Sequence, residues 1–465
     1  MFDLAIIGAG FSGTVMAAQL LRQTKNTDKT LRIALIEKKE SIGQGTAYGT
    51  TEDCHLLNVP AGKMSALSTE PQHFLNWLQV QSEKLNFPSY TSGSFVPRRI
   101  YGLYLQDLLT KSIEGKGKNT ECVTLQHSVE DLEFIKDEAH VFCKNGEVLK
   151  AKQVVLATGN YQPLVPKIPS GQFEGCARYV NDPWAKDGLR GFKPNDDILI
   201  IGTGLTMVDL ILSLHQKAHR GTIHAVSFKG FLPQPHKASP EYPSFLDLTE
   251  HKKISIRKLT SLVRHHIRTA EQAGGNWRAV IDSLRPKTQA LWTALSLEEK
   301  RRFLRHVRPF WDVHRHRIAP DVFQLMQDFK ARGQLVLHAG RLQSLRESSH
   351  AMEVKLALKG SRGSQTLKIQ SVINCTGPNY NALKNQDPLI QNLLKRSYIS
   401  PHILGMGLQA SSNGAMIQQD GTRSTRLYTL GGLQIGELWE NTAVPDLRVQ
   451  VEKLSKTLLG VWSSQ

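Results

Sequence analysis

The chain has 465 residues, of which 40% are hydrophobic and 21% charged, and its formal net charge is +17. These fractions are ordinary for a globular chain of two or three domains, and no apolar run approaches the roughly 18 residues that span a bilayer. The N-terminus has no basic and apolar signal pattern, so we expect a cytoplasmic protein without a membrane segment.

Five cysteines are scattered along the chain, and none of them forms Cys-x-x-Cys. An odd, dispersed set of thiols argues against a disulfide framework, a thiol redox pair and a zinc site, and it fits a reducing compartment. We therefore expect no metal. The cysteines are Cys54, Cys122, Cys143, Cys176 and Cys375.

The first thirteen residues combine a strand with a glycine-rich turn. Asp3 to Ile7 is predicted as a buried strand that runs into Gly8-x-Gly10-x-x-Gly13, and a helical pattern follows. Gly8 permits a tight turn, Gly10 lets the backbone approach a pyrophosphate, and Gly13 lets helix and strand pack closely. The helix N-terminus, which includes Ser12, offers free N–H groups and a positive dipole end to phosphates.

A second predicted strand, Leu31 to Ile36, ends at Glu37. A carboxylate at this point can bind both ribose hydroxyls of an adenosine, and Lys38 lies beside it. Strand, glycines, helix, strand and acid in this order predict a dinucleotide site. A unit of this kind that begins almost at residue 1 resembles the FAD-binding unit of flavoproteins.

The segment after Glu37 combines a glycine-rich loop around Tyr48 with the stretch His55 to Ala61. A helix opened by Pro71-x-x-Phe74 and a basic helix that begins Pro97-Arg98-Arg99 follow. This arrangement resembles the flavin-binding half of N-hydroxylating and related flavoprotein monooxygenases. The resemblance implies that these parts surround the flavin ring.

The same resemblance gives roles to single residues in this segment. It implies that Asn58 and Met64 lie near the isoalloxazine ring, and that Arg98 or Arg99 lies near the substrate or the second cofactor. The tyrosines of the basic helix are also explained by core packing alone. Tyr48 and Val129 are further candidates for contacts with FAD.

Two strands that end in glycine turns mark where the chain passes between domains. The first is the buried run that leads into Ala157-Thr158-Gly159. The second is Ser371 to Cys375, which leads into Thr376-Gly377. In two-dinucleotide flavoproteins such turns carry the chain from one nucleotide domain to the other, so we expect a second nucleotide domain between them.

That second domain contains its own glycine turn. Asp196 to Ile201 is a predicted strand followed by Gly202-x-Gly204 and a helix, and Met207 stands where a third glycine would be. Methionine there loosens the packing of helix and strand without touching the phosphate contact. A nucleotide site is favoured, and a degenerate Rossmann unit kept for structure is the alternative.

The strand from Thr222 to Phe228 decides which nicotinamide nucleotide fits. No acid ends it; Ser227 and Lys229 stand there instead. A hydroxyl and an ammonium attract the 2′-phosphate that an acid would repel. The sequence therefore favours NADPH over NADH and leaves both open.

A short motif precedes this unit. Phe173-x-Gly175-x-x-x-Tyr179-x-x-x-Pro183 is similar to the Phe-x-Gly-x-x-x-His-x-x-x-Trp/Pro fingerprint of class B flavoprotein monooxygenases. Tyr179 replaces the histidine, which is the most informative position, so a plain surface loop is an equal interpretation.

Residues 245–335 carry helical patterns that do not fit a Rossmann fold. From His251 to Leu335 there are 18 Lys/Arg and 7 Asp/Glu, so this segment supplies 11 of the net +17 charges. We expect helical structure after the basic stretch Lys252 to Lys258 and again from Glu298 to Val307. The densest run of charge contains Arg305, Arg308, Arg315 and Arg317.

The charge of this segment has more than one explanation. An anion-binding wall over the active site and a solvated basic face are both open. Metal binding by His306, His314 and His316 is disfavoured because the last two alternate along the chain and Asp312 is the only acid nearby. Nucleic acid is disfavoured because no recognised binding motif accompanies the charge.

The C-terminal part closes the first domain. Leu427 to Gly432 is a predicted strand that ends in glycines, and a final helix opens after Gly436. In two-dinucleotide flavoproteins such a helix points its N-terminus at the flavin. That resemblance makes Glu440, Asn441 and Thr442 candidate flavin neighbours.

Together these elements predict an α/β fold with two Rossmann-like dinucleotide-binding domains and a basic helical insertion. We expect an FAD-binding domain over residues 1–165 and 371–465. An NAD(P)-binding domain over 166–245 and 336–370 should carry the insertion at 246–335. The stretches at residues 45–49, 55–61, 202–209 and 311–316 resemble the FAD/NAD(P)-binding family that includes FAD-dependent urate hydroxylases.

The resemblance implies an enzyme that uses FAD, NADPH or NADH, and O₂. It would hydroxylate a small anionic substrate, with urate as one candidate, through a flavin C4a-hydroperoxide. A flavin dehydrogenase or reductase without oxygen insertion is the first alternative. A nucleotide-binding protein that docks a partner through the basic insertion is the second. The sequence does not fix the oligomeric state.

Overall fold

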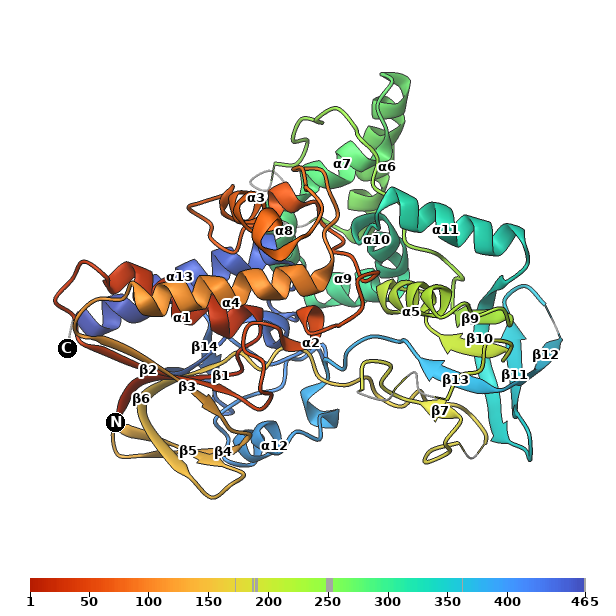
Figure 1. The fold of residues 1–465 in the computed structure, drawn as a ribbon. Helices are drawn as coiled ribbons and strands as arrows, with labels where there is room; N and C mark the ends of the chain where they lie inside the picture. The colour runs from red at the N-terminus through yellow and green to blue at the C-terminus, as the bar shows by residue number, and fades with distance from the viewer. Residues whose placement is uncertain (172, 186–187, 189–190, 248–253, 362, 464–465) are drawn as a thin grey trace. The chain divides into compact units, whose positions relative to one another are not determined.

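The computed structural model describes residues 1–171, 173–185, 188, 191–247, 254–361 and 363–463 (Figure 1). Its contacts divide the chain into two compact units. Unit 1 comprises residues 1–161 and 379–465, and unit 2 comprises residues 162–378. The fold is a mixed α/β fold with two largely parallel sheets, one in each unit, which confirms the predicted fold class.

Unit 1 is built on a sheet in the order β14-β15-β6-β1-β2-β3, with β5 joining β4 to β6. Strands β1, β2, β3, β6 and β15 run parallel to their neighbours on this path. The strands are β1 (Phe2–Ile7), β2 (Leu31–Glu37), β3 (Thr120–Gln126), β4 (Val129–Ile135), β5 (Glu138–Cys143), β6 (Val148–Leu156), β14 (Ala415–Ile417) and β15 (Arg423–Thr429).

Helices cover one face of this sheet, and an antiparallel β layer with one helix covers the other (Figure 1). Helix α1 packs between α4 and α13, while α12 lies against β4. The central strand β1 is buried on both faces, as its unbroken apolar run Leu4 to Ile7 requires. The helices are α1 (Phe11–Thr24), α2 (Gly45–Tyr48), η1 (Ala61–Lys63), α3 (His73–Leu85), α4 (Arg98–Glu114), η4 (Ala382–Lys384), α12 (Pro388–Lys395), η5 (Gly431–Gln434) and α13 (Val444–Ser463).

Unit 2 has a sheet in the order β12-β11-β10-β9-β8-β13-β7. Strands β7, β13, β8, β9 and β10 are parallel, and β10, β11 and β12 form an antiparallel extension. The strands are β7 (Tyr179–Val180), β8 (Ile198–Ile201), β9 (Ile223–Ser227), β10 (Leu335–Glu347), β11 (Met352–Leu358), β12 (Ser364–Ile369) and β13 (Ser371–Asn374).

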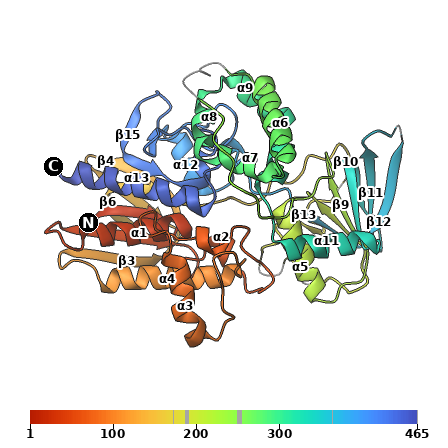
Figure 2. The same ribbon diagram turned by 90° about the horizontal axis from the view of Figure 1, so that it is seen from above.

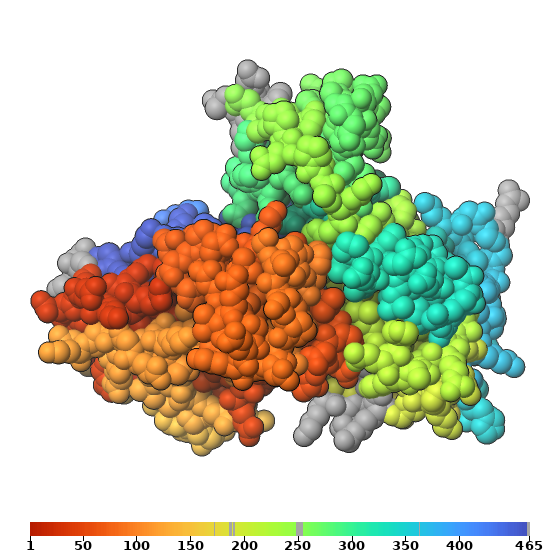
Figure 3. Space-filling model, turned by 45° about the horizontal axis from the view of Figure 1, so that its top comes forward, coloured from red at the N-terminus to blue at the C-terminus, as the bar shows by residue number. Residues whose placement is uncertain are grey.

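The helices of unit 2 fall into two groups. Helices α5 (Leu205–Gln216) and α11 (Pro320–Ala331) belong to the Rossmann-like part. The others gather into a helical segment; Figure 2 shows α6, α7, α8 and α9 side by side, and the green surface in Figure 3 belongs to this part of the chain. They are α6 (Ile256–Gln272), α7 (Trp277–Leu284), η2 (Arg285–Lys287), α8 (Thr288–Ala294), α9 (Leu297–Arg302), η3 (Phe303–Val307) and α10 (Arg308–Arg315).

Two features of the helical segment differ from the sequence-based expectation. The helix expected from Glu298 to Val307 is α9 followed by the π-helical turn η3. Pro309 explains the change, because proline has no N–H to continue an α-helical hydrogen bond at the start of α10. Of the basic stretch, Lys252 and Lys253 lie outside the described residues, and Ser255 caps α6 by accepting from the Lys258 N–H.

The division between units also lies a few residues from the expected one. Strand β13, expected to open the closing part of the FAD domain, instead pairs with β8 and β7 in the sheet of unit 2. The chain therefore returns to unit 1 only after Gly377 and Pro378.

A buried histidine of unit 2, His338, pairs with the half-buried His224, and this pair should make the stability of the fold depend on pH. His224 Nδ1 on β9 lies 3.0 Å from His338 Nε2 on β10. Burial lowers the pKa of both rings below 6.5, and the neighbouring ring lowers that of His338 further. The folded state therefore resists protonation that the unfolded chain accepts below pH 6.5.

We predict that the free energy of unfolding falls as the pH is lowered through 6.5, by up to about 1.4 kcal/mol per pH unit for each proton withheld. His338→Gln keeps a hydrogen-bonding partner for His224 but removes one titrating ring, so its unfolding free energy should fall less steeply. Urea denaturation between pH 7.5 and about pH 5 measures the slope. His350→Gln, on an exposed turn, is the control. Identical slopes in all three proteins would contradict this account of the pair.

Candidate cofactor and active site

The first glycine turn of unit 1 is shaped for close approach. Gly8 has φ +101°, and a Cβ on it would lie 2.4 Å from the Ala157 carbonyl oxygen. A Cβ on Gly13 would lie 1.8 Å from the Gly8 oxygen. Both positions therefore exclude any side chain. Gly10 is different, because its Cβ would meet only Gly45 Cα, at 3.5 Å, so the protein itself would accept alanine there.

Glu37 joins this turn to the end of β2. Its Oε2 accepts from the Ala9 N–H at 2.8 Å, and its Oε1 accepts from the Lys39 N–H at 3.1 Å. The carboxylate is largely buried, at 9% exposure, whereas the neighbouring Lys38 is exposed. The acid that the sequence assigned to the adenosine ribose is thus held rigidly beside the glycine turn.

Three turns from distant parts of the chain meet at the same edge of the sheet. Because β1, β6 and β15 are parallel neighbours, the turns that follow them lie side by side. A Cβ on Gly431, after β15, would lie 3.4 Å from Ser12 Oγ in α1. A Cβ on Gly432 would lie 2.8 Å from Asn160 Oδ1, just after β6. The candidates Gly8, Ser12, Thr158 and Gly159 therefore share one edge with Gly431 and Gly432.

The segment before the last helix adds an unsatisfied polar atom. Asn441 is fully buried and donates from Nδ2 to the Gly431 oxygen at 2.7 Å. Its Oδ1 is buried and has no hydrogen-bond partner among the described residues. A buried acceptor without a hydrogen bond costs about 1–3 kcal/mol of folding stability, and a donor on a bound ligand would remove this cost. Glu440 is also buried, with φ +65°, while Thr442 is exposed.

The loop that the sequence placed at the flavin ring is firmly held. Met64 is 3% exposed, and its backbone oxygen accepts from the Tyr101 hydroxyl at 2.8 Å. Arg98 donates from its Nε to the Leu56 oxygen at 3.0 Å, so it belongs to the same loop structure. Asn58 is half-buried.

Three other candidates occupy different surroundings. Arg99 points to an exposed ion pair with Asp53. Tyr48 packs on Tyr101 with ring centroids 4.7 Å apart. Val129 opens β4 and is buried in the core beneath the sheet.

The second glycine turn, in unit 2, repeats the geometry of the first. Gly202 has φ +108°, and its Cβ would lie 2.3 Å from the Cys375 oxygen. Gly204 is the N-cap of α5. A Cβ on Gly204 or on Gly377 would have no atom within 4 Å. Met207 is fully buried beneath the helix. Thr376 caps the neighbouring turn by donating from Oγ1 to Asn374 Oδ1 at 2.7 Å.

A cluster of cations and aromatic rings lies at the carboxyl end of β9. Lys229 Nζ lies 5.6 Å from the Phe228 ring centroid and 5.2 Å from that of Phe310. Arg341 covers the same Phe228 ring at 4.6 Å. In the described part of the chain neither cation has a carboxylate partner, and both rings are more than 40% exposed. The free charges make this end of the strand attractive to an anion.

Arg341 could not be found from the sequence. It lies on β10, which follows Lys229 in the sequence only after the whole helical segment, and no motif surrounds it. By contrast, Ser227 behaves as a structural residue: its Oγ lies 2.8 Å from Thr203 Oγ1 and accepts from the Gly230 N–H at 3.0 Å.

The dense run of arginines does not form one exposed wall. Arg317 is buried, pairs with Asp282 and lies over the Trp277 ring. Arg315 is also buried, at 9% exposure. Two of the four arginines therefore pack inside the helical segment, and neither an anion-binding wall nor a solvated face can include all four of them. Arg305 is exposed, and Arg308 pairs with Asp312 at 3.3 Å.

Tyr179 of the class B-like motif is held by packing and a hydrogen bond, and the cysteines form no disulfide. Tyr179 packs on Phe173 with centroids 4.9 Å apart and donates to Asn181 Oδ1 at 3.0 Å. Burial raises the pKa of Tyr179, so it stays protonated. All five cysteines are free thiols. Burial raises the pKa of the Cys375 thiol, which therefore lacks thiolate character.

One family model matches the N-terminal part of the chain. Residues 5–161 match the family model described as FAD-NAD(P)-binding. No curated protein matches the sequence. None of the described helices is long and apolar enough to cross a membrane.

Solved structures extend the likeness over the whole chain. L-lysine 6-monooxygenase from Pseudomonas syringae has a TM-score of 0.67 at 15% identity, covering 99% of each chain. Ornithine N-hydroxylase from Kutzneria sp. 744 has a TM-score of 0.63 at 12% identity, covering 99% of this chain and 100% of that one. Thioredoxin reductase from Lactococcus lactis scores 0.53 at 10% identity, covering 100% of both. The fold is that of two-dinucleotide flavoproteins.

We predict that Gly10→Ala weakens FAD binding while the protein stays folded. The added Cβ fits the protein, so the clash falls on the pyrophosphate; overpacking of 1–3 kcal/mol corresponds to roughly a tenfold or larger loss of affinity. Gly93→Ala is the matched control, since its Cβ would also meet nothing tight. The FAD-to-protein ratio and the dissociation constant of FAD provide the measurement. Undiminished FAD binding by Gly10→Ala would remove this turn from the cofactor site.

Proposed function

We propose that this protein is an FAD-dependent, NADPH-using monooxygenase that inserts one atom of O₂ into a small substrate. The observation that carries the proposal is the presence of two dinucleotide turns in a chain whose five cysteines form no disulfide. Two such turns suit a hydride donor and a flavin acceptor. The chain has no disulfide to receive the electrons, as a disulfide reductase would need, and this favours O₂ as the acceptor.

The residues of unit 1 fit FAD. Bound FAD would accept hydride and pass electrons to O₂, which is chemistry that protein side chains do not supply. Gly8, Gly10 and the N-terminus of α1 would bind the pyrophosphate, and Glu37 would bind the ribose. The buried Asn441 Oδ1 would accept from the cofactor. Asn58, Met64 and Arg98 are proposed to line the ring.

The residues of unit 2 favour NADPH. Gly202 and Gly204 would bind its pyrophosphate at the N-terminus of α5. Lys229 and Arg341 supply two positive charges without acidic partners for the 2′-phosphate, and the exposed rings of Phe228 and Phe310 keep both cations in place.

We propose a small substrate that carries an acidic group. Arg305 and Arg308 are the surface arginines of the dense run that remain as candidates to contact it. Urate is one candidate substrate. Ornithine and lysine are the substrates named for two similar monooxygenases. Both carry a carboxylate, which the same arginines could bind. The free thiols agree with a reducing compartment such as the cytoplasm.

The alternative is a flavin reductase that does not insert oxygen. The two are separated by mixing FAD-loaded protein with NADPH and a panel of urate, L-ornithine and L-lysine in air. A monooxygenase consumes NADPH and O₂ in equal amounts, releases little peroxide with the true substrate, and yields a product heavier by one oxygen. NADPH oxidation that gives only peroxide with every substrate would favour the reductase.

We predict that Lys229→Glu weakens NADPH binding about tenfold to a hundredfold and NADH binding much less. One charge-assisted contact with the 2′-phosphate is worth roughly 1.5–3 kcal/mol. Arg341→Ala should act in the same direction. Lys217→Glu, an equal change of charge at the other end of α5, is the control. Titration of the FAD-loaded protein with each nucleotide gives the dissociation constants. Equal losses for both nucleotides would refute the role of this cluster.

A further inference from the structure

Two tyrosines of α4 hold neighbouring peptide groups of the loop that carries Met64. The Tyr101 hydroxyl donates to the Met64 oxygen at 2.8 Å, and the Ala66 N–H donates to the Tyr104 hydroxyl oxygen at 3.2 Å. Both rings are fully buried, and burial raises the pKa of both phenols, so both hydroxyls keep their protons. Phenylalanine would fill the same space, so the hydroxyls serve the loop rather than the packing.

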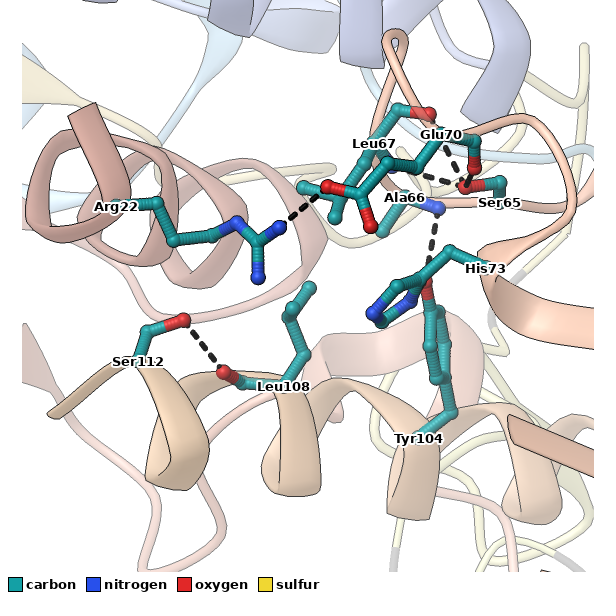
Figure 4. A network of polar contacts seen from close by, with 9 residues as sticks. All are labelled: Arg22, Ser65, Ala66, Leu67, Glu70, His73, Tyr104, Leu108 and Ser112. Atoms are coloured by element: carbon teal, nitrogen blue, oxygen red, sulfur yellow. Dashed lines mark hydrogen bonds and ion pairs between the residues drawn. The ribbon is translucent and has the colours of Figure 1, made fainter. Parts of the chain in front are cut away.

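The peptide group between them is held from a different helix. Arg448 of α13 donates from Nη1 to the Ser65 oxygen at 3.0 Å. The Ser65 side chain in turn closes the loop on itself, donating to the Leu67 oxygen at 3.0 Å and lying 2.6 Å from the Glu70 oxygen (Figure 4). Three consecutive residues, Met64 to Ala66, are thereby fixed by side chains from two helices.

This loop has no regular secondary structure to satisfy its backbone. It lies between η1, which ends at Lys63, and α3, which begins at His73. Figure 4 shows that His73 completes the arrangement, with its Nδ1 2.8 Å from the Tyr104 hydroxyl. Ala66 N–H, Tyr104 and His73 form a continuous chain of hydrogen bonds. Met64, Ser65 and Ala66 are buried, so water does not satisfy their peptide groups. Side chains supply the partners instead, and they specify the positions of successive peptides.

Arg448 also brings a positive charge to this loop. In the part of the chain that the structure describes it has no carboxylate partner, and its Nε is buried without a hydrogen-bond partner. It lies on the helix that follows the Asn441 segment, so one side chain ties the Met64 loop to the segment that approaches Gly431.

We propose that Tyr101, Tyr104 and Arg448 are positioning residues that set the Met64–Ala66 backbone, and with it the environment of the bound flavin ring. The inference rests on the proposed function, which places this loop at the ring. The tyrosines fix where the loop stands, and Arg448 also supplies a positive charge that favours electrons added to the flavin. None of the three needs to touch the substrate.

The experiment compares Tyr101→Phe, Tyr104→Phe and Arg448→Met in the FAD-loaded protein. Each variant is measured for FAD content, thermal midpoint, visible absorbance of the flavin and its reduction potential under anaerobic conditions. We expect the tyrosine variants to shift the flavin absorbance. We expect Arg448→Met to change the oxidised-to-reduced equilibrium at least tenfold toward the oxidised form, which lowers a two-electron potential by about 30 mV.

The matched control is Ser112→Ala. Ser112 is also buried in α4, but its hydroxyl donates only to the Leu108 oxygen one turn away (Figure 4). It should lower the thermal midpoint without changing the flavin spectrum or potential. Arg448→Lys keeps the charge and should restore most of the potential lost in Arg448→Met.

The outcomes distinguish this inference from the proposed function. If the variants and Ser112→Ala change stability alone, with full FAD content and an unchanged spectrum and potential, the three residues are structural and the inference fails. If the unmutated protein binds no FAD, the proposed function itself fails. Should a tyrosine variant not fold, the comparison of Arg448→Met with Arg448→Lys decides the matter by itself.

Discussion

Close approach of backbone to backbone at the carboxyl edge of a parallel sheet is the constraint on which the structure depends. A side chain at Gly8 would strike Ala157, one at Gly13 would strike Gly8, and one at Gly202 would strike Cys375. These contacts bring strand, turn and helix close together. The first N–H groups of the helix have no partner within the helix, and the turn places them at the carboxyl edge of the sheet. Such groups bind phosphates without any charged side chain.

The same constraint organises the rest of each unit. In unit 1 the parallel order of β15, β6, β1 and β2 brings Gly431, Gly159, Gly10 and Glu37 to one edge, although they are far apart in the sequence. In unit 2 the order of β8, β9 and β10 brings Lys229 and Arg341 together at the end of β9. The chain therefore has one candidate dinucleotide site at the sheet edge of unit 1 and another at that of unit 2. The transfer of electrons that we propose requires both sites.

Local chemistry was predictable from the sequence, and long-range pairing was not. Gly8, Gly13 and Gly202 are readable because the turn conformation requires glycine whatever surrounds it. Arg341 and Arg448 carry no such local signal, since their importance comes from partners on other strands and helices. The burial of Arg317 was not visible in the sequence, because a run of charge says nothing of Trp277 and Asp282, which reach Arg317 only in the folded chain. Pro309 at the start of α10 was visible in the sequence, but the π-helical turn η3 before it was not.

The central claim is that one chain passes hydride from NADPH to FAD. Anaerobic mixing of the FAD-loaded protein with NADPH tests it without knowledge of the substrate. The account predicts bleaching of the visible flavin absorbance, faster with NADPH than with NADH, and recovery of the absorbance when O₂ is admitted. A flavin that stays oxidised with both nucleotides, in protein that carries stoichiometric FAD, would contradict the account.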